Sequence, residues 1–213
     1  RNQQGLITQY LAASGMTIVC LDDSLYIALQ KKIAGLPVET HGLDIVSQYE
    51  VLRDTPGLKP ALASRPKPQW YWTWASQAAS WALAHREDAW ITYLDSDLFF
   101  FADPEPAFRE IGEAEVGIHT HRFPDRYKNR EVRGIHNVGF VAFRNLPGGR
   151  GAAAWWAERV RKQCESDMPV LRSLLPNGEF WEHPAGTAGD QGWLAAFGHL
   201  APTCIIEHPG AAL

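Results

Sequence analysis

Two carboxylates, Asp95 and Asp97, stand two residues apart directly after an apolar run at residues 89–94. Side chains of an extended chain alternate with period two, so these two carboxylates would point to the same side. Carboxylate oxygens are hard ligands that suit Mg²⁺ or Mn²⁺, and an ion held there could grip a diphosphate. An ordinary polar turn would use the same residues, because carboxylates are common turn formers. The tripeptide Asp95-Ser96-Asp97 therefore needs context before chemistry can be assigned to it.

The elements that must position these carboxylates alternate between strands and helices. Apolar runs predict strands at residues 16–21, 36–39, 89–94, 115–119, 138–143 and 203–206. Spacing and capping predict helices over 5–13, 24–32 with Ser24 as cap, 69–86, 151–166 and 188–197, and a short helix with a loop over 41–68. Continuous apolar strands separated by helices indicate a mostly parallel sheet, whose ligands bind at the carboxyl ends. We therefore expect one α/β, Rossmann-like domain over residues 1–213.

Bulk composition narrows the class of partner. With 213 residues and 46% apolar content, the chain can build the core of one domain. The net charge of −4 argues against a nucleic-acid partner, and the local basic group of His121, Arg122, Arg126, Lys128 and Arg130 suits small anions. No run approaches the roughly 20 apolar residues of a transmembrane helix, and no signal segment opens the chain. Three scattered cysteines give neither a disulfide framework nor zinc spacing, so we expect a cytoplasmic protein.

Four separated segments match one family pattern in order. They are Tyr93-Leu94-Asp95-Ser96-Asp97, Asn137-Val138-Gly139-Phe140, Gly189-Asp190-Gln191 and His208-Pro209-Gly210. Together they resemble the motifs of nucleotide-sugar glycosyltransferases with the GT-A fold, most closely the retaining galactosyltransferase and glycogenin-like group and its uncharacterised bacterial relatives. No single motif is specific, but the four in order are, and the likeness spans residues 5–213. The resemblance implies transfer of a sugar from a nucleoside-diphosphate sugar, expected to be a UDP-sugar, to a hydroxyl of a glycan or other acceptor.

The resemblance also implies how the donor is held. Asp95 and Asp97 would bind Mn²⁺ or Mg²⁺, with His208 as the third protein ligand, and such a mixed set suits Mn²⁺. Ser96 would lie against the donor, and Gly210 would let the backbone approach the diphosphate because it has no Cβ. Taken alone, His208 would be an exposed polar residue and Gly210 an ordinary turn.

Five further residues are assigned to the sugar and the acceptor on the same grounds. Asn137, Asp190 and Gln191 would position them, because amides and carboxylates suit a polyol. His121 and Arg122 would contact the sugar or the acceptor. Structural alternatives stay open: Asn137 could cap a turn, Asp190 could cap the helix that follows it, and the basic pair could be solvated.

The chemistry that the resemblance implies is electrostatic. Cleavage of the sugar leaves a charged diphosphate, and a metal bridging its oxygens stabilises that charge. With retention, the acceptor hydroxyl would attack from the face that the nucleotide leaves. Gln191 would then lie near the anomeric carbon and Asp190 would orient the sugar, and neither is assigned as a nucleophile.

The chain departs from the family pattern at both ends, which keeps two other hypotheses open. Nothing before Arg1 supplies the strand that holds the base, and no Ala-Pro-Trp-like segment follows Leu213, so we expect a domain without its first strand and its C-terminal tail. One alternative is a degenerate sugar-nucleotide-binding or scaffold domain without activity. The other is a haloacid-dehalogenase-type phosphohydrolase, although its Asp-x-Asp normally lies near the N-terminus and precedes Thr or Val, not Leu98.

Overall fold

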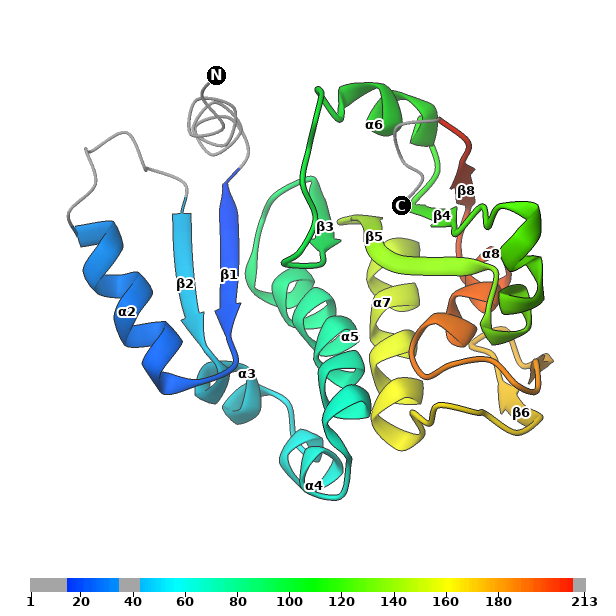
Figure 1. Cartoon of the computed structure of the whole chain (residues 1–213), viewed down its shortest axis with the longest axis horizontal. Coiled ribbons are helices and arrows are strands. Elements are labelled where there is room, and N and C mark those ends of the chain that lie inside the picture. Colours follow the sequence, from blue (N-terminus) through cyan, green and yellow to red (C-terminus); the bar gives the residue numbers. More distant parts are fainter. Residues whose placement is uncertain (1–14, 35–42, 209–213) are drawn as a thin grey trace. The chain divides into compact units, whose positions relative to one another are not determined.

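Residues 15–34 and 43–208 are described by the computed structural model, and they belong to two units. Unit 1 comprises Arg1–Pro56, and unit 2 comprises Gly57–Leu213. Figure 1 shows that each unit has strands and helices of its own. The chain is thus mixed α/β, and the expectation of one domain over residues 1–213 stays a prediction.

Unit 1 is a parallel strand pair connected through a helix. β1 (Met16–Cys20) pairs in register with β2 (Leu43–Ser47), α2 (Asp23–Ala34) comes between them in the chain, and α3 (Gln48–Asp54) follows. A capping box starts α3. The Ser47 side chain accepts from a backbone N–H of α3, and the Glu50 side chain accepts from the Ser47 N–H.

The start of α2 corrects one sequence prediction. Asp22 Oδ1 accepts hydrogen bonds from the backbone N–H of Leu25 and the hydroxyl of Ser24, both at 2.7 Å. The expected cap Ser24 therefore donates to the actual capping side chain. β2 is also a correction, since the sequence predicted a helix and a loop there. The helix expected over 5–13 and the strand expected over 36–39 lie outside the described residues.

Unit 2 is built on a mixed four-stranded sheet in the order β3-β5-β4-β8. Its strands are β3 (Trp90–Leu94), β4 (Val116–Thr120), β5 (His136–Arg144) and β8 (Thr203–Ile206). β5 is antiparallel to β3 and β4, and β4 is parallel to β8. The mostly parallel sheet predicted from apolar runs is therefore not confirmed, since the described sheet of unit 2 is mixed. A central strand covered on both faces is continuously apolar whichever way it runs, and that pattern cannot reveal direction.

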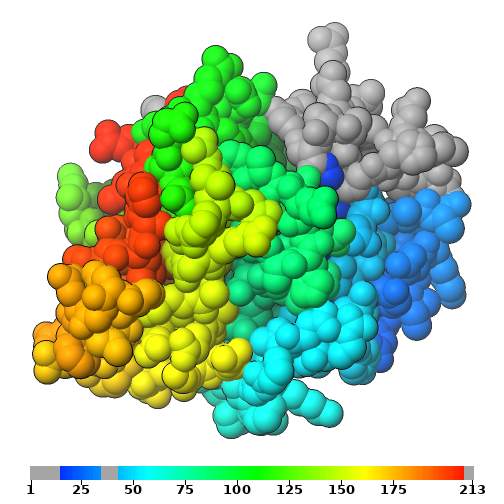
Figure 2. Space-filling view, turned by 180° about the vertical axis from the view of Figure 1, so that it is seen from behind, coloured from blue at the N-terminus to red at the C-terminus, as the bar shows by residue number. Residues whose placement is uncertain are grey.

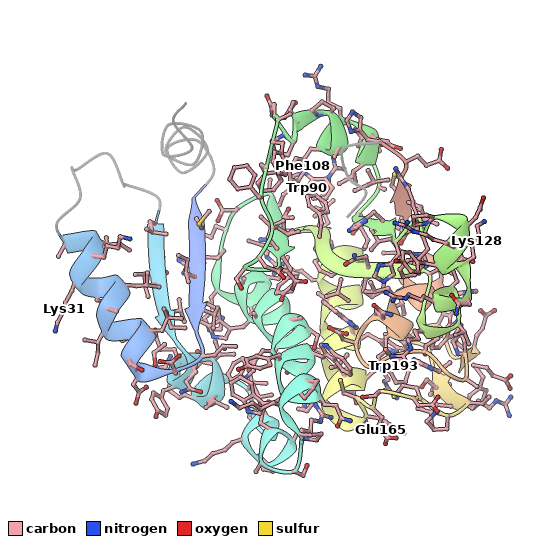
Figure 3. All side chains as sticks on the ribbon, viewed as in Figure 1. Lys31, Trp90, Phe108, Lys128, Glu165 and Trp193 are labelled. Carbon is pink, nitrogen blue, oxygen red and sulfur yellow. The ribbon has the colours of Figure 1, made fainter. Side chains whose placement is uncertain are left out.

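Helices cover both faces of this sheet. α5 (Lys67–His85) and α7 (Pro147–Lys162) share one apolar cluster with Val141 and Phe143, whereas α6 (Glu105–Ile111) shares another with Phe140 and Ala142. The alternation along β5 sends neighbouring side chains to opposite faces. Figure 3 shows Trp90 and Phe108, which pack against the α6 cluster. None of the helices among the described residues is long and apolar enough to cross a membrane.

The remaining elements of unit 2 are α4 (Leu58–Ala63), η1 (Asp125–Arg133), β6 (Leu171–Leu174), β7 (Phe180–His183), η2 (Gln191–Ala196) and α8 (Phe197–Leu200). Two of them, β7 and η2, meet α7 in an aromatic cluster. Trp193 is 2% exposed and makes edge contacts with Trp155 and His183, at ring distances of 5.8 and 4.3 Å, while Trp181 lies 5.9 Å away. The helix expected over 188–197 is thus a 3₁₀ turn followed by one α turn. The hairpin β6-β7, α6 and η1 were not predicted.

The C-terminal elements close unit 2 on the side of α7. Figure 2 shows α7 in yellow beside the red and orange segments that follow residue 180. Phe197 of α8 meets Trp156 of α7 edge-on at 6.0 Å, and both side chains are fully buried. This contact ties η2, and the residues just before it, to the main core.

Candidate functional site

Strand ends gather the predicted residues at one edge of the unit 2 sheet. β3, β4 and β8 run in the same direction, so their carboxyl ends meet the start of the antiparallel strand β5. Asp95 follows β3, His121 follows β4, and Asn137 lies at the start of β5. η2 brings in Asp190 and Gln191 from outside the sheet. The sequence-predicted positions therefore meet, although they are far apart in the chain.

Asp95-Ser96-Asp97 forms a turn and not an extended strand. The Asp95 N–H still bonds to the carbonyl of Gly139 at 3.0 Å, and the Leu98 N–H then returns to the Asp95 carbonyl at 3.2 Å. The argument that the two carboxylates point the same way by strand alternation is therefore wrong for Asp97. Ser96 and Asp97 are exposed, whereas Asp95 is half-buried.

The acid group, defined as Asp95, Asp97 and Asp190 around Tyr93, lies beside the main core. The Tyr93 hydroxyl donates to Asp95 Oδ1 at 2.7 Å. Burial raises the pKa of the Tyr93 phenol far above its usual range, and the charges of Asp95, Asp190 and Asp97 add to the rise. All three carboxylates therefore act on one phenol.

Asp190 is the buried member of the acid group. It is 7% exposed, and its backbone carbonyl accepts from Trp156 Nε1 at 2.9 Å. Burial raises the pKa of its carboxyl to about 8, and the charge of Asp95 acts in the same direction. Asp190 precedes η2 at the cap position, yet its side chain makes no capping bond. The structural alternative of a helix cap therefore does not explain this residue.

The amide relay, defined as Asn137, His121 and Gln191, is a continuous chain of hydrogen bonds. The Gly139 N–H donates to Asn137 Oδ1 at 2.6 Å, and Asn137 Nδ2 lies 3.1 Å from His121 Nδ1. On the other side of the ring, His121 Nε2 lies 3.2 Å from Gln191 Oε1. Gln191 Nε2 then donates to the Arg133 carbonyl at 2.7 Å.

The relay selects one tautomer of His121. Backbone groups at both ends fix which atom of each amide is oxygen, so Asn137 donates to Nδ1 and Gln191 accepts from Nε2. In this arrangement Nδ1 is the acceptor and Nε2 carries the ring proton that is donated to Gln191. It also stacks on Phe123, with ring centroids 4.6 Å apart. Relay geometry thus depends on several segments at once.

Gly134 makes room for the far end of the relay. Its φ of +122° lies in a region that favours glycine, and a Cβ built there would lie 3.1 Å from Gln191 Nε2. A side chain at this position would press on the amide that bonds to Arg133. The close approach therefore needs a glycine.

Arg122 and His208 meet through the backbone. Arg122 donates to the carbonyls of Ile206 and His208, and Arg122 itself has a positive φ of 47°. The expectation of a sugar or acceptor contact for Arg122 stays a prediction, but its guanidinium already has two protein partners. Gly210 lies outside the described residues.

The expected metal set of Asp95, Asp97 and His208 is not gathered in the part of the chain that is described. No three His, Cys, Asp or Glu residues there form a group that could hold a metal ion. The strand order gives the reason: β3 and β8 are the two outer strands, three spacings or about 14 Å apart. Asp95 and Asp97 alone still fit an ion of the Mg²⁺ type, which often takes one or two protein carboxylates and completes its shell with phosphate and water. The role of His208 stays a prediction.

Three buried histidines, among them His183, were missed by sequence reasoning. His119 and His136 are 0% and 6% exposed, and His119 Nε2 and His136 Nδ1 have no hydrogen-bond partner among the described residues. Burial lowers the pKa of both, for His119 to about 4. Both residues lie in the apolar strands β4 and β5, on either side of the basic loop, and this position in the sequence could have indicated that they are buried. Glu110, which bonds to the backbone of Glu207 and His208, was missed because nothing local marks it.

The proteins that are similar to this chain have no assigned activity. No protein-family model matches it, and no solved structure matches it significantly. Two uncharacterized proteins of Bacillus subtilis (strain 168) are similar: YfnF is 25% identical over 210 residues, and YfnD is 27% identical over 167. These alignments cover 92% and 78% of this chain, but 60% and 51% of the two relatives. The chain thus spans little more than half of the length of the relatives it matches.

Proposed function

We propose that unit 2 carries the site of a metal-dependent glycosyltransferase of the GT-A kind. It would move a sugar from a UDP-sugar to the hydroxyl of a glycan or other acceptor, with retention. The observation that carries the proposal is the meeting of the acid group and the amide relay at one sheet edge. A sugar diphosphate needs both a site for its counter-ion and a set of directional hydrogen-bonding groups for its hydroxyls.

Asp95 and Asp97 are the residues that would hold a Mn²⁺ or Mg²⁺ ion. When bound, the ion supplies positive charge against the diphosphate that leaves the sugar. The Tyr93 hydroxyl orients the Asp95 carboxylate by donating to one of its two oxygens. The other Asp95 oxygen and the exposed Asp97 carboxylate are then the natural contacts for such an ion.

Asp190 and Gln191 are the residues that would touch the transferred sugar. Since burial raises the pKa of Asp190 to about 8, its carboxyl is largely protonated at neutral pH and can donate to a sugar oxygen as well as accept. Gln191 uses one lone pair of Oε1 for His121, and the second lone pair stays available for the substrate. The relay would hold this amide in one orientation as the bond to the nucleotide breaks.

The deciding experiment is a donor panel with the full 213-residue chain, Mn²⁺ and a mixture of hydroxyl acceptors. Release of UDP from one UDP-sugar, dependent on Mn²⁺ and lost in Asp97→Asn, is the expected result. Asp88→Asn is the matched control, because it makes the same chemical change at the exposed residue before the opposite end of β3. Release of inorganic phosphate would instead indicate a phosphohydrolase. Binding of UDP without turnover of any donor would indicate a binding or scaffold domain.

A further inference from the structure

The segment that leaves β8 is held on one side by a carboxylate from α6. Glu110 Oε1 accepts from the Glu207 N–H at 2.6 Å, and Glu110 Oε2 accepts from the His208 N–H at 2.9 Å. One carboxylate thus accepts from two successive backbone donors just beyond the end of β8. α6 and β8 lie side by side in Figure 1, and they share the second apolar cluster through Ile111 and Ile206.

The same segment is held on its other side by a guanidinium from the loop after β4. Arg122 Nη2 donates to the Ile206 carbonyl at 2.6 Å, and Nη1 donates to the His208 carbonyl at 3.1 Å. Arginine suits this arrangement because its planar fork presents several donors at fixed spacing. Arg122 reaches it from a backbone with φ +47°, which an L-residue adopts only when the surroundings enforce it.

Opposite charges therefore grip one short peptide segment from two elements. Hydrogen bonds to ionised groups are stronger than neutral ones, so four such bonds on residues 206–208 fix the backbone well beyond the end of the strand. The bonds that Glu110 and Arg122 make to this segment all go to backbone groups and not to charged side chains. The backbone strain at Arg122 is then explained by the geometry that these bonds demand.

We propose that Glu110 and Arg122 are a pair of positioning residues, here called the peptide clamp, for the donor end of the site. The clamp holds the Ile206–His208 segment, and because Arg122 follows His121 directly, it also holds the loop that carries the relay imidazole. It therefore joins the exit of β8 to the relay across the end of β4. The role in donor binding rests on the proposed function, whereas the ordering of the segment does not.

The ordering is tested by backbone amide hydrogen exchange of residues 206–208. Glu110→Gln keeps one acceptor oxygen but turns an amide donor toward a backbone N–H, and Arg122→Lys keeps the charge but loses the fork. Both variants should exchange at least 10-fold faster at these amides than the wild type. The controls are Glu113→Gln, which changes a carboxylate on the 96% exposed side chain after α6, and Arg172→Lys on the hairpin. Unchanged exchange in both clamp variants would overturn the clamp.

The role in the site is tested by calorimetric titration of UDP in the presence of Mn²⁺. Each clamp variant should weaken UDP binding by about 10-fold or more, the scale on which supporting residues act on bound metals. The group that the clamp would place is the His208 imidazole, which the family resemblance assigns to the metal. His208→Ala removes this ring and keeps the backbone N–H that Glu110 holds, so in this background Glu110→Gln should weaken binding no further. An equal loss in both backgrounds would make the effect a general loss of structure and overturn the positioning role. If the wild type binds no UDP, the donor role falls with the proposed function, while the exchange result still decides the clamp.

Discussion

The acid group and the amide relay share one sheet edge, yet they are built on opposite principles. Each relay side chain is hydrogen-bonded to its neighbours, in a chain that runs from one backbone anchor at Gly139 to another at Arg133. The acid group instead brings three carboxylates to one tyrosine, and Asp190 avoids the cost of burial by a raised pKa. The hydrogen bonds of the folded chain therefore hold the relay in place without a ligand. The carboxylates of the acid group repel one another, so they destabilise the folded state unless a proton or a cation is bound.

Loss of one exposed carboxylate should show this difference most strongly. Asp97→Asn should reduce Mn²⁺-dependent release of UDP by about 100-fold or more, the size expected when a charge-stabilising group is removed. Its melting temperature should stay equal to the wild type or rise, because repulsion within the acid group decreases. Scanning calorimetry beside the donor assay checks both. A clear fall in melting temperature would show that Asp97 is part of the scaffold instead.

Breaking the relay should lower activity less than Asp97→Asn does, and it should lower the free energy of unfolding more. Asn137→Ala removes the acceptor of the Gly139 N–H and the donor to His121, so we expect a loss of about 1 kcal/mol in the free energy of unfolding. Turnover should fall by about 10- to 100-fold, because Gln191 loses its fixed orientation. Urea unfolding and the donor assay measure the two effects. Asn177→Ala, in the turn between β6 and β7, is the control, and equal behaviour of the two variants would refute the relay.

The pH dependence of stability should reveal the buried proton of Asp190. Its pKa is about 8 in the folded protein and about 3.9 in an unfolded chain. Between these values the unfolded state releases this proton while the folded state keeps it, so stability falls as pH rises from about 4 to 8. In EDTA, the wild-type melting temperature should therefore decline over this window more than that of Asp190→Asn. Parallel curves for the two proteins would place the carboxyl in water.

A smaller effect of opposite sign is expected from His119. Its pKa is about 4 when folded and about 6.5 when unfolded. The unfolded state then binds the extra proton first, so stability is lost as pH falls from 6.5 toward 4. The two windows overlap between about pH 4 and 6.5, so the effect of His119 is found by comparing variant with wild type. His119→Gln should abolish this loss, while the decline that Asp190 causes from about pH 4 to 8 stays in place. Scanning calorimetry of both proteins over this range measures the difference, and identical curves below about pH 6.5 would contradict a buried neutral ring.

Sequence patterns predicted the elements better than their arrangement. The long helix over 69–86 and the strands ending near Leu94 and Ile206 are confirmed, because uninterrupted apolar or helical spacing is a local signal. The antiparallel direction of β5 could not be predicted, because pairing direction depends on the partner and not on the strand itself. The hairpin β6-β7 was missed since both strands are short and mostly exposed.

The candidate site was predictable in its residues but not in its contacts. Asn137, His121 and Gln191 were each assigned to the sugar or the acceptor, and only the fold shows that they form one relay. Asp97 was placed by strand alternation, but β3 ends at Leu94 and a turn follows. Glu110 carried no signal because its partners are two backbone amides nearly 100 positions away in the chain.

The aromatic cluster around Trp193 gives the site an optical probe of its own. Trp193, labelled in Figure 3, lies two residues after Gln191 on η2. Its indole contacts the rings of Trp155, Trp181 and His183. Indoles packed this closely couple electronically, so near-ultraviolet circular dichroism and emission would change when η2 shifts. A ligand that moves η2 could therefore be followed without a label, and Trp193→Phe would show how much of the spectrum reports on this element.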